Sequence, residues 1–262
     1  MERITHYIPQ HWIDWEKSGT TLPEFMEAYQ HADCFTQRNL IDSILLQTNP
    51  KWLELRAGRF TCSKAAEFLS DPVAKADKEA GKIGETAKKL VYKVMAEKYT
   101  NWREPEMSWN DKASVKRGLI FEPVARQLAE EKLGIKIKQV GIITYGDWFG
   151  YSPDGIDEND PETGIEIKTF EPAHYYQTIM EAADIKIRKQ MQMQAWAGGL
   201  KRIYFVLYCP EVDPNNVVIL KYTRGIKYQA DLERRSVKIL EYMKEVQEQH
   251  NKGEIVIETV EK

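Results

Sequence analysis

The segment from Ser152 to Lys168 constrains the fold more than any other part of the chain. It reads Ser-Pro-Asp-Gly, then an acidic run rich in turn-forming residues, and then Glu166-Ile167-Lys168. A run of this kind between two short apolar stretches predicts a β-hairpin. Because side chains alternate along a strand, we expect Glu166 and Lys168 on one face and Ile167 on the other, toward the core. Folding the hairpin would therefore bring Asp154 close to Glu166 and Lys168.

Hydrophobic periodicity predicts helices and strands on both sides of this hairpin. The expected helices cover residues 63–69, 83–99, 111–133, 184–199 and 226–250, and the expected strands cover 137–145, 148–152, 164–170, 202–209 and 217–223. The polar stretch 70–82 is typical of a mobile loop. Pro123 lies inside the long helix beside Glu122, where it removes one hydrogen bond at a cost of about 3 kcal/mol and predicts a kink. The order of the elements predicts an α/β (α+β) fold with a mixed central sheet flanked by helices.

The same patterns divide the chain into three parts. Residues 1–50 are expected to form an N-terminal helical extension, residues 51–225 the main domain, and residues 226–262 a C-terminal helix and tail that pack on that domain. A chain of 262 residues is long enough to bury a full core.

The composition excludes several classes of function. The 37 basic and 40 acidic residues give a net charge of −3, so any contact with nucleic acid must come from local clusters such as 186–189 and 221–224. The three cysteines are scattered, which argues against a zinc or iron–sulfur site and for a reducing compartment. There is no phosphate-binding loop for ATP, no signal-peptide pattern and no apolar run long enough to span a membrane. We therefore expect a cytoplasmic protein.

The carboxylates around the hairpin are suited to hold a hard metal ion. Mg²⁺ prefers carboxylate, carbonyl and water oxygens, which Asp154, Glu166 and the backbone carbonyl of Ile167 would supply. Lys168 would position an attacking water and stabilise developing charge, and Glu122 would complete the metal shell or serve a second metal. Taken singly, each residue is also compatible with a solvated strand face, a turn or a helix surface. Their combination favours a site.

The chain resembles the phage lambda exonuclease type of PD-(D/E)XK nuclease, a family used in viral recombination. The resemblance covers about residues 50–210. It rests on Trp52 to Gly58 with Thr61-Cys62-Ser63, on Arg117-Gly118 through Glu122, on Ser152-Pro153-Asp154-Gly155, on Glu166-Ile167-Lys168, and on Gln190-Met191-Gln192 with Trp196. The fold implied by this resemblance is a restriction-endonuclease-like core.

The resemblance also implies roles for single residues. Asp154, Glu166 and Lys168 match the metal-binding and water-activating positions, and Glu122 matches a helix glutamate of the same site. Gln190 matches a glutamine beside the attacking water, with Gln192 close behind it as an alternative.

Two further residues match a pocket for the end of the DNA. Arg56 matches an arginine that grips a 5′-phosphate, for which a bidentate guanidinium is well suited. Ser63 would bond the same phosphate, although a plain helix N-cap explains it equally well. A second aspartate often found before the Ser-Pro-Asp turn has Asp147 as its nearest candidate.

The implied activity is that of a Mg²⁺-dependent 5′→3′ exonuclease, with Mn²⁺ able to substitute. It would degrade one strand of linear double-stranded DNA and leave a 3′ overhang. The implied partners are DNA ends, further copies of the chain in a ring, with a trimer preferred, and a single-strand annealing protein. If the protein is phage-encoded, it would act in the cytoplasm of a bacterial host. Two alternatives stay open, namely an endonuclease of the same superfamily and a catalytically silent module that binds DNA ends or loads a recombinase.

Overall fold

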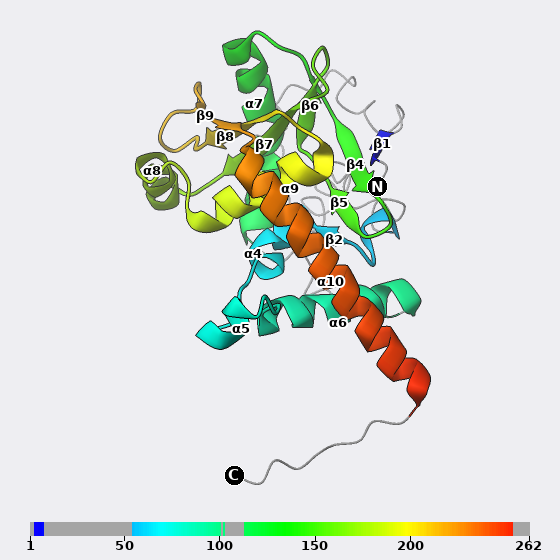
Figure 1. Ribbon diagram of the computed structural model, residues 1–262. Helices are drawn as coiled ribbons and strands as arrows, with labels where there is room; N and C mark the ends of the chain where they lie inside the picture. The colour runs from blue at the N-terminus through cyan, green and yellow to red at the C-terminus, as the bar shows by residue number, and fades with distance from the viewer. Residues whose placement is uncertain (1–2, 8–53, 101, 103–112, 254–262) are drawn as a thin grey trace.

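The computed structural model describes residues 3–7, 54–100, 102 and 113–253. Two β-sheets are packed together with helices around and between them (Figure 1). One sheet has the order β1-β4-β5-β2, formed by Arg3–Tyr7, Val140–Tyr145, Phe149–Tyr151 and Phe60–Thr61. The other has the order β3-β6-β7-β8-β9, formed by Ile137–Lys138, Gly155–Asp157, Thr163–Thr169, Arg202–Tyr208 and Val218–Thr223.

α-Helices and a 3₁₀ helix accompany these strands in the described part of the chain. They are η3 Cys62–Lys64, α4 Ala65–Phe68, α5 Lys75–Glu79, α6 Glu85–Tyr99, α7 Ala113–Leu133, α8 Pro172–Met180, α9 Ile185–Gly198 and α10 Ile226–Lys252. Helix α9 begins where the side chain of Asp184 accepts a hydrogen bond from the N–H of Ile187 at 2.8 Å, and it ends at Gly199 with φ of 69°. Both ends therefore follow the usual capping chemistry. No helix in the described ranges is long and apolar enough to cross a membrane.

The five-stranded sheet places its two faces against different helices. Strands β6 and β7 form the predicted antiparallel hairpin, with Gly155 opposite Ile165, and β7 runs parallel to β8. Ile165 and Ile167 are buried in a cluster with residues of α7. Since side chains alternate along a strand, Glu166 and Lys168 face the other side of the sheet, where α9 lies.

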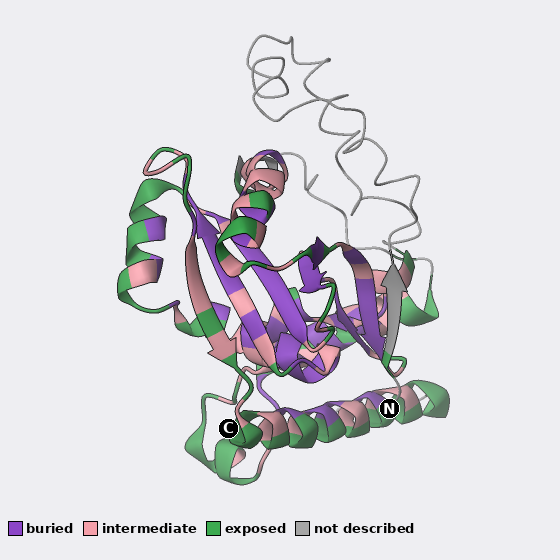
Figure 2. Ribbon diagram, turned by 90° about the horizontal axis from the view of Figure 1, so that it is seen from above, coloured by how far each residue is buried: buried purple, intermediate pink, exposed green. Residues whose placement is uncertain are grey.

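Helix α9 lies at the centre of the molecule and contacts both sheets (Figure 1). Its Trp196 packs edge-on against Tyr145 and Phe149, with ring centroids 5.0 and 4.8 Å apart. Figure 2 shows that buried residues are concentrated in the central strands, whereas exposed residues lie mainly on the helices.

The predicted mixed α/β architecture is confirmed, and the differences lie in its short elements. The strands form two sheets rather than one, and β1 lies within residues 1–50, where helix was expected. The rest of that extension lies outside the described residues. The stretch 70–82 contains the short helix α5, which buries none of its residues and so leaves no apolar pattern to detect. Helix α8 was also not expected. The long helix α7 does contain Pro123, as predicted.

Candidate active site

The hairpin between β6 and β7 brings Asp154 to the edge of β7. Its Oδ2 accepts a hydrogen bond from the backbone N–H of Ile167 at 2.7 Å. Strand β6 pairs with β7 only through Gly155 and Ile156, so at Ile167 a side chain replaces the neighbouring strand. In an extended backbone the N–H and C=O of one residue point to the same edge. The carbonyl of Ile167 therefore faces the same side as Asp154.

Glu166 is the most enclosed carboxylate of the site, with a side-chain exposure of 4%. Its Oε1 accepts hydrogen bonds from Lys168 Nζ at 2.5 Å and from Gln190 Nε2 at 2.7 Å. Its Oε2 accepts a hydrogen bond from Gln194 Nε2 at 2.6 Å. Three donors from β7 and α9 thus fix this carboxylate in one orientation.

Glu122 approaches the same place from α7. Its carboxylate pairs with Arg126 one turn further along the helix at 2.6 Å, and it remains partly exposed. Burial raises the pKa of Glu122, with a further upward contribution from Glu166, while Arg126 and Lys168 act in the opposite direction. The helix glutamate is therefore within electrostatic reach of the charged pair on β7.

The carboxylates of Asp154, Glu166 and Glu122 lie close enough to repel one another, and the nearby positive charge does not cancel this repulsion at Asp154. Burial raises the pKa of Asp154 well above its usual value, and the charges of Glu166 and Glu122 raise it further. For Lys168, burial lowers the pKa, but the carboxylates of Glu166 and Asp154 outweigh this effect and the net shift is upward. The side chain of Lys168 is therefore protonated and positively charged at neutral pH.

This donor set fits a hard divalent cation of the Mg²⁺ type. Asp154, Glu166 and the carbonyl of Ile167 are oxygen donors, and an added cation would relieve the repulsion that raises the pKa of Asp154. Among the residues that the structure describes, no three His, Cys, Asp or Glu side chains are already gathered as a ready-made metal site. Mg²⁺ does not require such a cage, because it keeps several waters and takes only one or two carboxylates from a protein.

Arg56 reaches the site through the turn that carries Asp154. Its Nη1 donates to Ser152 Oγ at 3.0 Å, two residues before Asp154. Burial lowers the pKa of Arg56 to about 10, so the guanidinium is still charged at neutral pH. An arginine held beside a carboxylate-rich site is suited to bind a phosphate.

Ser63 follows this arginine by seven residues, and it does not occupy the helix N-terminus that the sequence predicted for it. The N-cap of η3 is Thr61, and the two hydroxyls are 3.1 Å apart. Ser63 itself is exposed and lies within the 3₁₀ helix, so the prediction that it opens the helix is wrong. Cys62 between them is buried, and burial followed by the charge of Glu166 raises the pKa of its thiol, while Arg56 lowers it. Arg56, η3 and Glu166 are thus electrostatic neighbours.

Other sequence candidates lie elsewhere. Asp147 is exposed in the turn between β4 and β5, where its charge acts on Arg59 and Lys98 rather than on the carboxylate cluster. Gln192 uses its backbone carbonyl to accept from Gln229 at 3.5 Å, whereas Gln190 bonds Glu166 directly. The structure therefore separates two glutamines that the sequence left as alternatives.

Within the basic run 186–189, Arg188 has a local structural role. Its guanidinium donates to the carbonyls of Ala183 and Glu181, at 2.9 and 2.6 Å. Ala182 and Ala183 have φ of 48° and 70°, a left-handed conformation that costs an alanine roughly 1–2 kcal/mol. Arg188 thus stabilises the strained turn that carries the chain from α8 into α9 and so toward Gln190.

Sequence reasoning missed two polar partners of the site. Gln194 holds Glu166 from a fully buried position, and Arg126 holds Glu122. A signal for Gln194 was present, because it follows Gln190 by four residues and so lies on the same face of the helix. Arg126 likewise follows Glu122 by four residues.

Solved structures place this architecture among alkaline exonucleases, which have the restriction-endonuclease-like fold. The alkaline exonuclease LHK-Exo from Laribacter hongkongensis is 23% identical, with a TM-score of 0.63, and the match covers 78% of this chain and 97% of that one. The same enzyme in complex with dAMP gives 22% and 0.64 over the same shares. A phage-related exonuclease from Haemophilus somnus 129PT is 17% identical with a TM-score of 0.54, over 73% of this chain and 96% of that one. At these identities the likeness establishes the fold.

The family follows from the sequence itself. Residues 51–201, more than half of the chain, match the model of the YqaJ-like viral recombinase domain. The protein belongs to this family, which confirms its resemblance to the lambda exonuclease type. A comparison with curated proteins found no match.

Proposed function

We propose that the protein is a Mg²⁺-dependent 5′→3′ exonuclease. It degrades one strand of linear double-stranded DNA and leaves a 3′ overhang for recombination. The observation that carries this proposal is the convergence of Asp154, Glu166 and Lys168 with Glu122 at the edge where β6 leaves β7. Membership of a viral recombinase family and the fold of alkaline exonucleases support a nuclease role.

Each residue of the site has a chemical task in this proposal. Asp154, Glu166 and the carbonyl of Ile167 would hold Mg²⁺, with Glu122 completing the shell or serving a second ion. When bound, the ion supplies Lewis-acid polarisation of a phosphoryl oxygen and acidifies water. Lys168 is protonated at neutral pH in the metal-free protein, and in this proposal it stabilises charge on the phosphate and orients the attacking water.

In this proposal Gln190 both lies beside the attacking water and holds the carboxylate of Glu166 in position. Its Nε2 donates to the same Glu166 oxygen that Lys168 binds, which leaves its amide oxygen to accept a hydrogen bond from a water. Gln194 holds the other oxygen of Glu166 from the buried side. The orientation of the carboxylate is thus set before substrate arrives.

Arg56 and Ser63 would recognise the 5′-phosphate at the end of the duplex. The link from Arg56 through Ser152 to the Asp154 turn fixes the phosphate pocket relative to the reacting centre. A pocket for an end phosphate is useful to an exonuclease and has no use in an endonuclease. This pocket therefore favours the exonuclease over the endonuclease alternative.

The wider assembly belongs to the same proposal. Several copies, preferably three, would form a ring around the duplex, and a single-strand annealing protein would receive the 3′ overhang. Mn²⁺ would substitute for Mg²⁺, because both ions take oxygen ligands in octahedral geometry. If phage-encoded, the protein would work in the bacterial host cytoplasm.

The test is digestion of linear duplex DNA with Mg²⁺, using 5′-phosphate ends, 5′-hydroxyl ends and closed circles. We expect mononucleotide release that depends on the phosphate, and a fall of about 10²–10³-fold in kcat for Lys168→Ala. Lys244→Ala, on the exposed surface of α10, is the matched control and should behave as wild type. Arg56→Lys should lower the preference for phosphate ends and leave the slow cleavage of hydroxyl ends unchanged.

Two other outcomes would reject the proposal. Cleavage of closed circles, or equal rates at both kinds of end, would assign the chain to the endonucleases. Metal-independent binding to DNA ends without hydrolysis would leave the silent end-binding module as the better account.

A further inference from the structure

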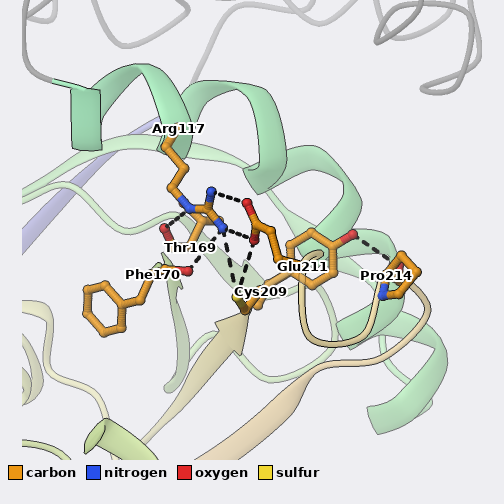
Figure 3. Close-up of polar contacts among 7 residues, drawn as sticks. Arg117, Thr169, Phe170, Cys209, Glu211 and Pro214 are labelled. Carbon is orange, nitrogen blue, oxygen red and sulfur yellow. Dashed lines mark hydrogen bonds and ion pairs between the residues drawn. The ribbon is translucent and has the colours of Figure 1, made fainter. Parts of the chain in front are cut away.

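Arg117 joins helix α7 to the ends of two strands. Its Nε donates to the carbonyl of Thr169 at 2.9 Å, and its Nη2 donates to the carbonyl of Phe170 at 3.0 Å (Figure 3). Its Nη1 and Nη2 bind both carboxylate oxygens of Glu211 at 2.7 and 2.5 Å, in a two-pronged pair. The Cys209 thiol lies 3.9 Å from Nη2 and 3.3 Å from Glu211. We call this set the Arg117 clamp.

The Arg117 clamp connects α7 and β7, the two elements that carry Glu122 and the Glu166–Lys168 pair. Thr169 directly follows Lys168 on β7, and Arg117 precedes Glu122 by five residues on α7. One guanidinium therefore connects the helix that carries Glu122 to the end of the strand that carries Lys168. The side chain of Arg117 is 16% exposed, so its bonds to the two backbone carbonyls are shielded from water, whereas Glu211 is 47% exposed.

Helix α7 needs an external anchor at this point. Pro123 has no N–H, so the hydrogen bond that would tie residue 123 back to residue 119 is missing. The turn that carries Glu122 is consequently less fixed by the helix itself. Arg126 holds the Glu122 carboxylate from one side of the break, and Arg117 anchors the backbone on the other.

From this placement we propose that Arg117 is a positioning residue of the active site. Through its bonds to Thr169, Phe170 and Glu211, it sets the distance between the Glu122 turn and the Glu166–Lys168 pair. This inference rests on the proposed nuclease function. It adds to that function a residue that touches neither metal nor substrate.

A second arginine offers a matched control for a merely structural role. Arg235 on α10 is 13% exposed and, like Arg117, binds main-chain carbonyls, here of Phe68 and Ser70, together with the carboxylate of Asp71. It connects α10 to the loop after α4, away from the carboxylate cluster. Arg235→Lys should therefore cost stability without altering the geometry of the site.

The experiment compares Arg117→Lys with Arg235→Lys by steady-state kinetics, thermal unfolding and backbone hydrogen exchange. Lysine keeps the charge but cannot reach several planar acceptors at once. We expect both variants to lose similar thermal stability. Only Arg117→Lys should lower kcat, by about ten- to a hundredfold with KM for DNA unchanged, because misplacement by about 1 Å costs that much. Exchange should rise at the backbone amides of residues 119–122 and 124 in Arg117→Lys alone.

The outcomes separate this inference from the proposed function. Loss of kcat no greater in Arg117→Lys than in Arg235→Lys would overturn the inference and leave the nuclease intact. A wild-type chain without any hydrolysis would reject the function, and the exchange data would then decide whether Arg117 fixes the Glu122 turn. Unchanged exchange at residues 119–122 and 124 would overturn the inference in either case.

Discussion

The carboxylate cluster of Asp154, Glu166 and Glu122 and the Arg117 clamp both involve α7 and β7, but they differ in charge balance. In the cluster, Asp154, Glu166 and Glu122 face Lys168 and Arg126, so negative charge is in excess. In the clamp, one guanidinium is balanced by one carboxylate, and the two hydrogen bonds between them measure 2.7 and 2.5 Å. A region left short of positive charge is prepared for a cation from solution, whereas a neutral and saturated region serves only to hold parts in place.

Removing the buried amide that steadies the cluster should have the largest effect on stability. Gln194→Leu leaves Glu166 Oε2 without its 2.6 Å donor in a buried position, so we expect the free energy of unfolding to fall by about 1.5–3 kcal/mol. Gln192→Leu on the same helix is the control, because its side chain takes no part in holding Glu166, and it should stay within about 0.5 kcal/mol of wild type. Urea unfolding measures both. Equal stability of the two variants would mean that neutral donors do not hold the cluster together.

The excess of charge in the cluster predicts a stabilising substitution. Asp154→Asn keeps an oxygen to accept from Ile167 N–H and removes one of three facing carboxylates, so the metal-free protein at pH 7 should melt about 3 °C higher. A raised carboxyl pKa means that the folded state binds protons more tightly, so wild-type stability falls as pH rises through that pKa. The difference between the two proteins should therefore shrink on acidification. A lower melting temperature for Asp154→Asn at pH 7 would show that the cluster is already balanced.

The same kind of substitution in the clamp should have the opposite sign and a smaller size. Glu211→Gln removes the carboxylate that Arg117 binds, and we expect the melting temperature at pH 7 to fall by about 1–3 °C. The hydrogen bond from Arg117 lowers the pKa of Glu211 to about 2, against an ordinary value of 4.5. A lowered pKa contributes stability above about pH 4.5, and this contribution is lost as pH falls toward 2.

Thermal unfolding from pH 7 down to pH 2 follows this loss. The curves of wild type and Glu211→Gln should converge at the acidic end, while Glu241→Gln on the exposed face of α10 should match wild type throughout. If the difference in melting temperature between wild type and Glu211→Gln stayed constant from pH 7 to pH 2, the charge of Glu211 would not be what stabilises the clamp.

The sequence predicted the elements that depend on local contacts and missed those that depend on contacts between distant parts of the chain. The β6–β7 hairpin and helices α6, α7, α9 and α10 carry their patterns within a few residues, and the structure has them close to where they were expected. Strand β1 pairs with β4 some 140 residues later, so no local pattern could show that it belongs to a sheet. Helix α5 buries nothing and therefore has no apolar stripe.

The site divides in the same way. Asp154 and the Glu166–Lys168 pair are recognisable because one hairpin joins them. Arg117 stands 52 and 94 residues before two of its partners, Thr169 and Glu211, and only the packed fold brings them together. The role of Gln190 rather than Gln192 likewise depends on which face of α9 meets β7, a matter of tertiary packing.

The short pairing of β6 has a consequence for how the site responds to mutation. Because β6 begins only at Gly155, opposite Ile165, the main chain of β7 at Ile167 is left open toward Asp154. The carbonyl of Ile167 is the one proposed ligand that no substitution can delete. Changes of side chain at this position alter only the packing against α7, where Ile167 is buried. The metal site would therefore tolerate Ile167→Val or Ile167→Leu, and selection at this position would be exerted by the hydrophobic core rather than by the chemistry.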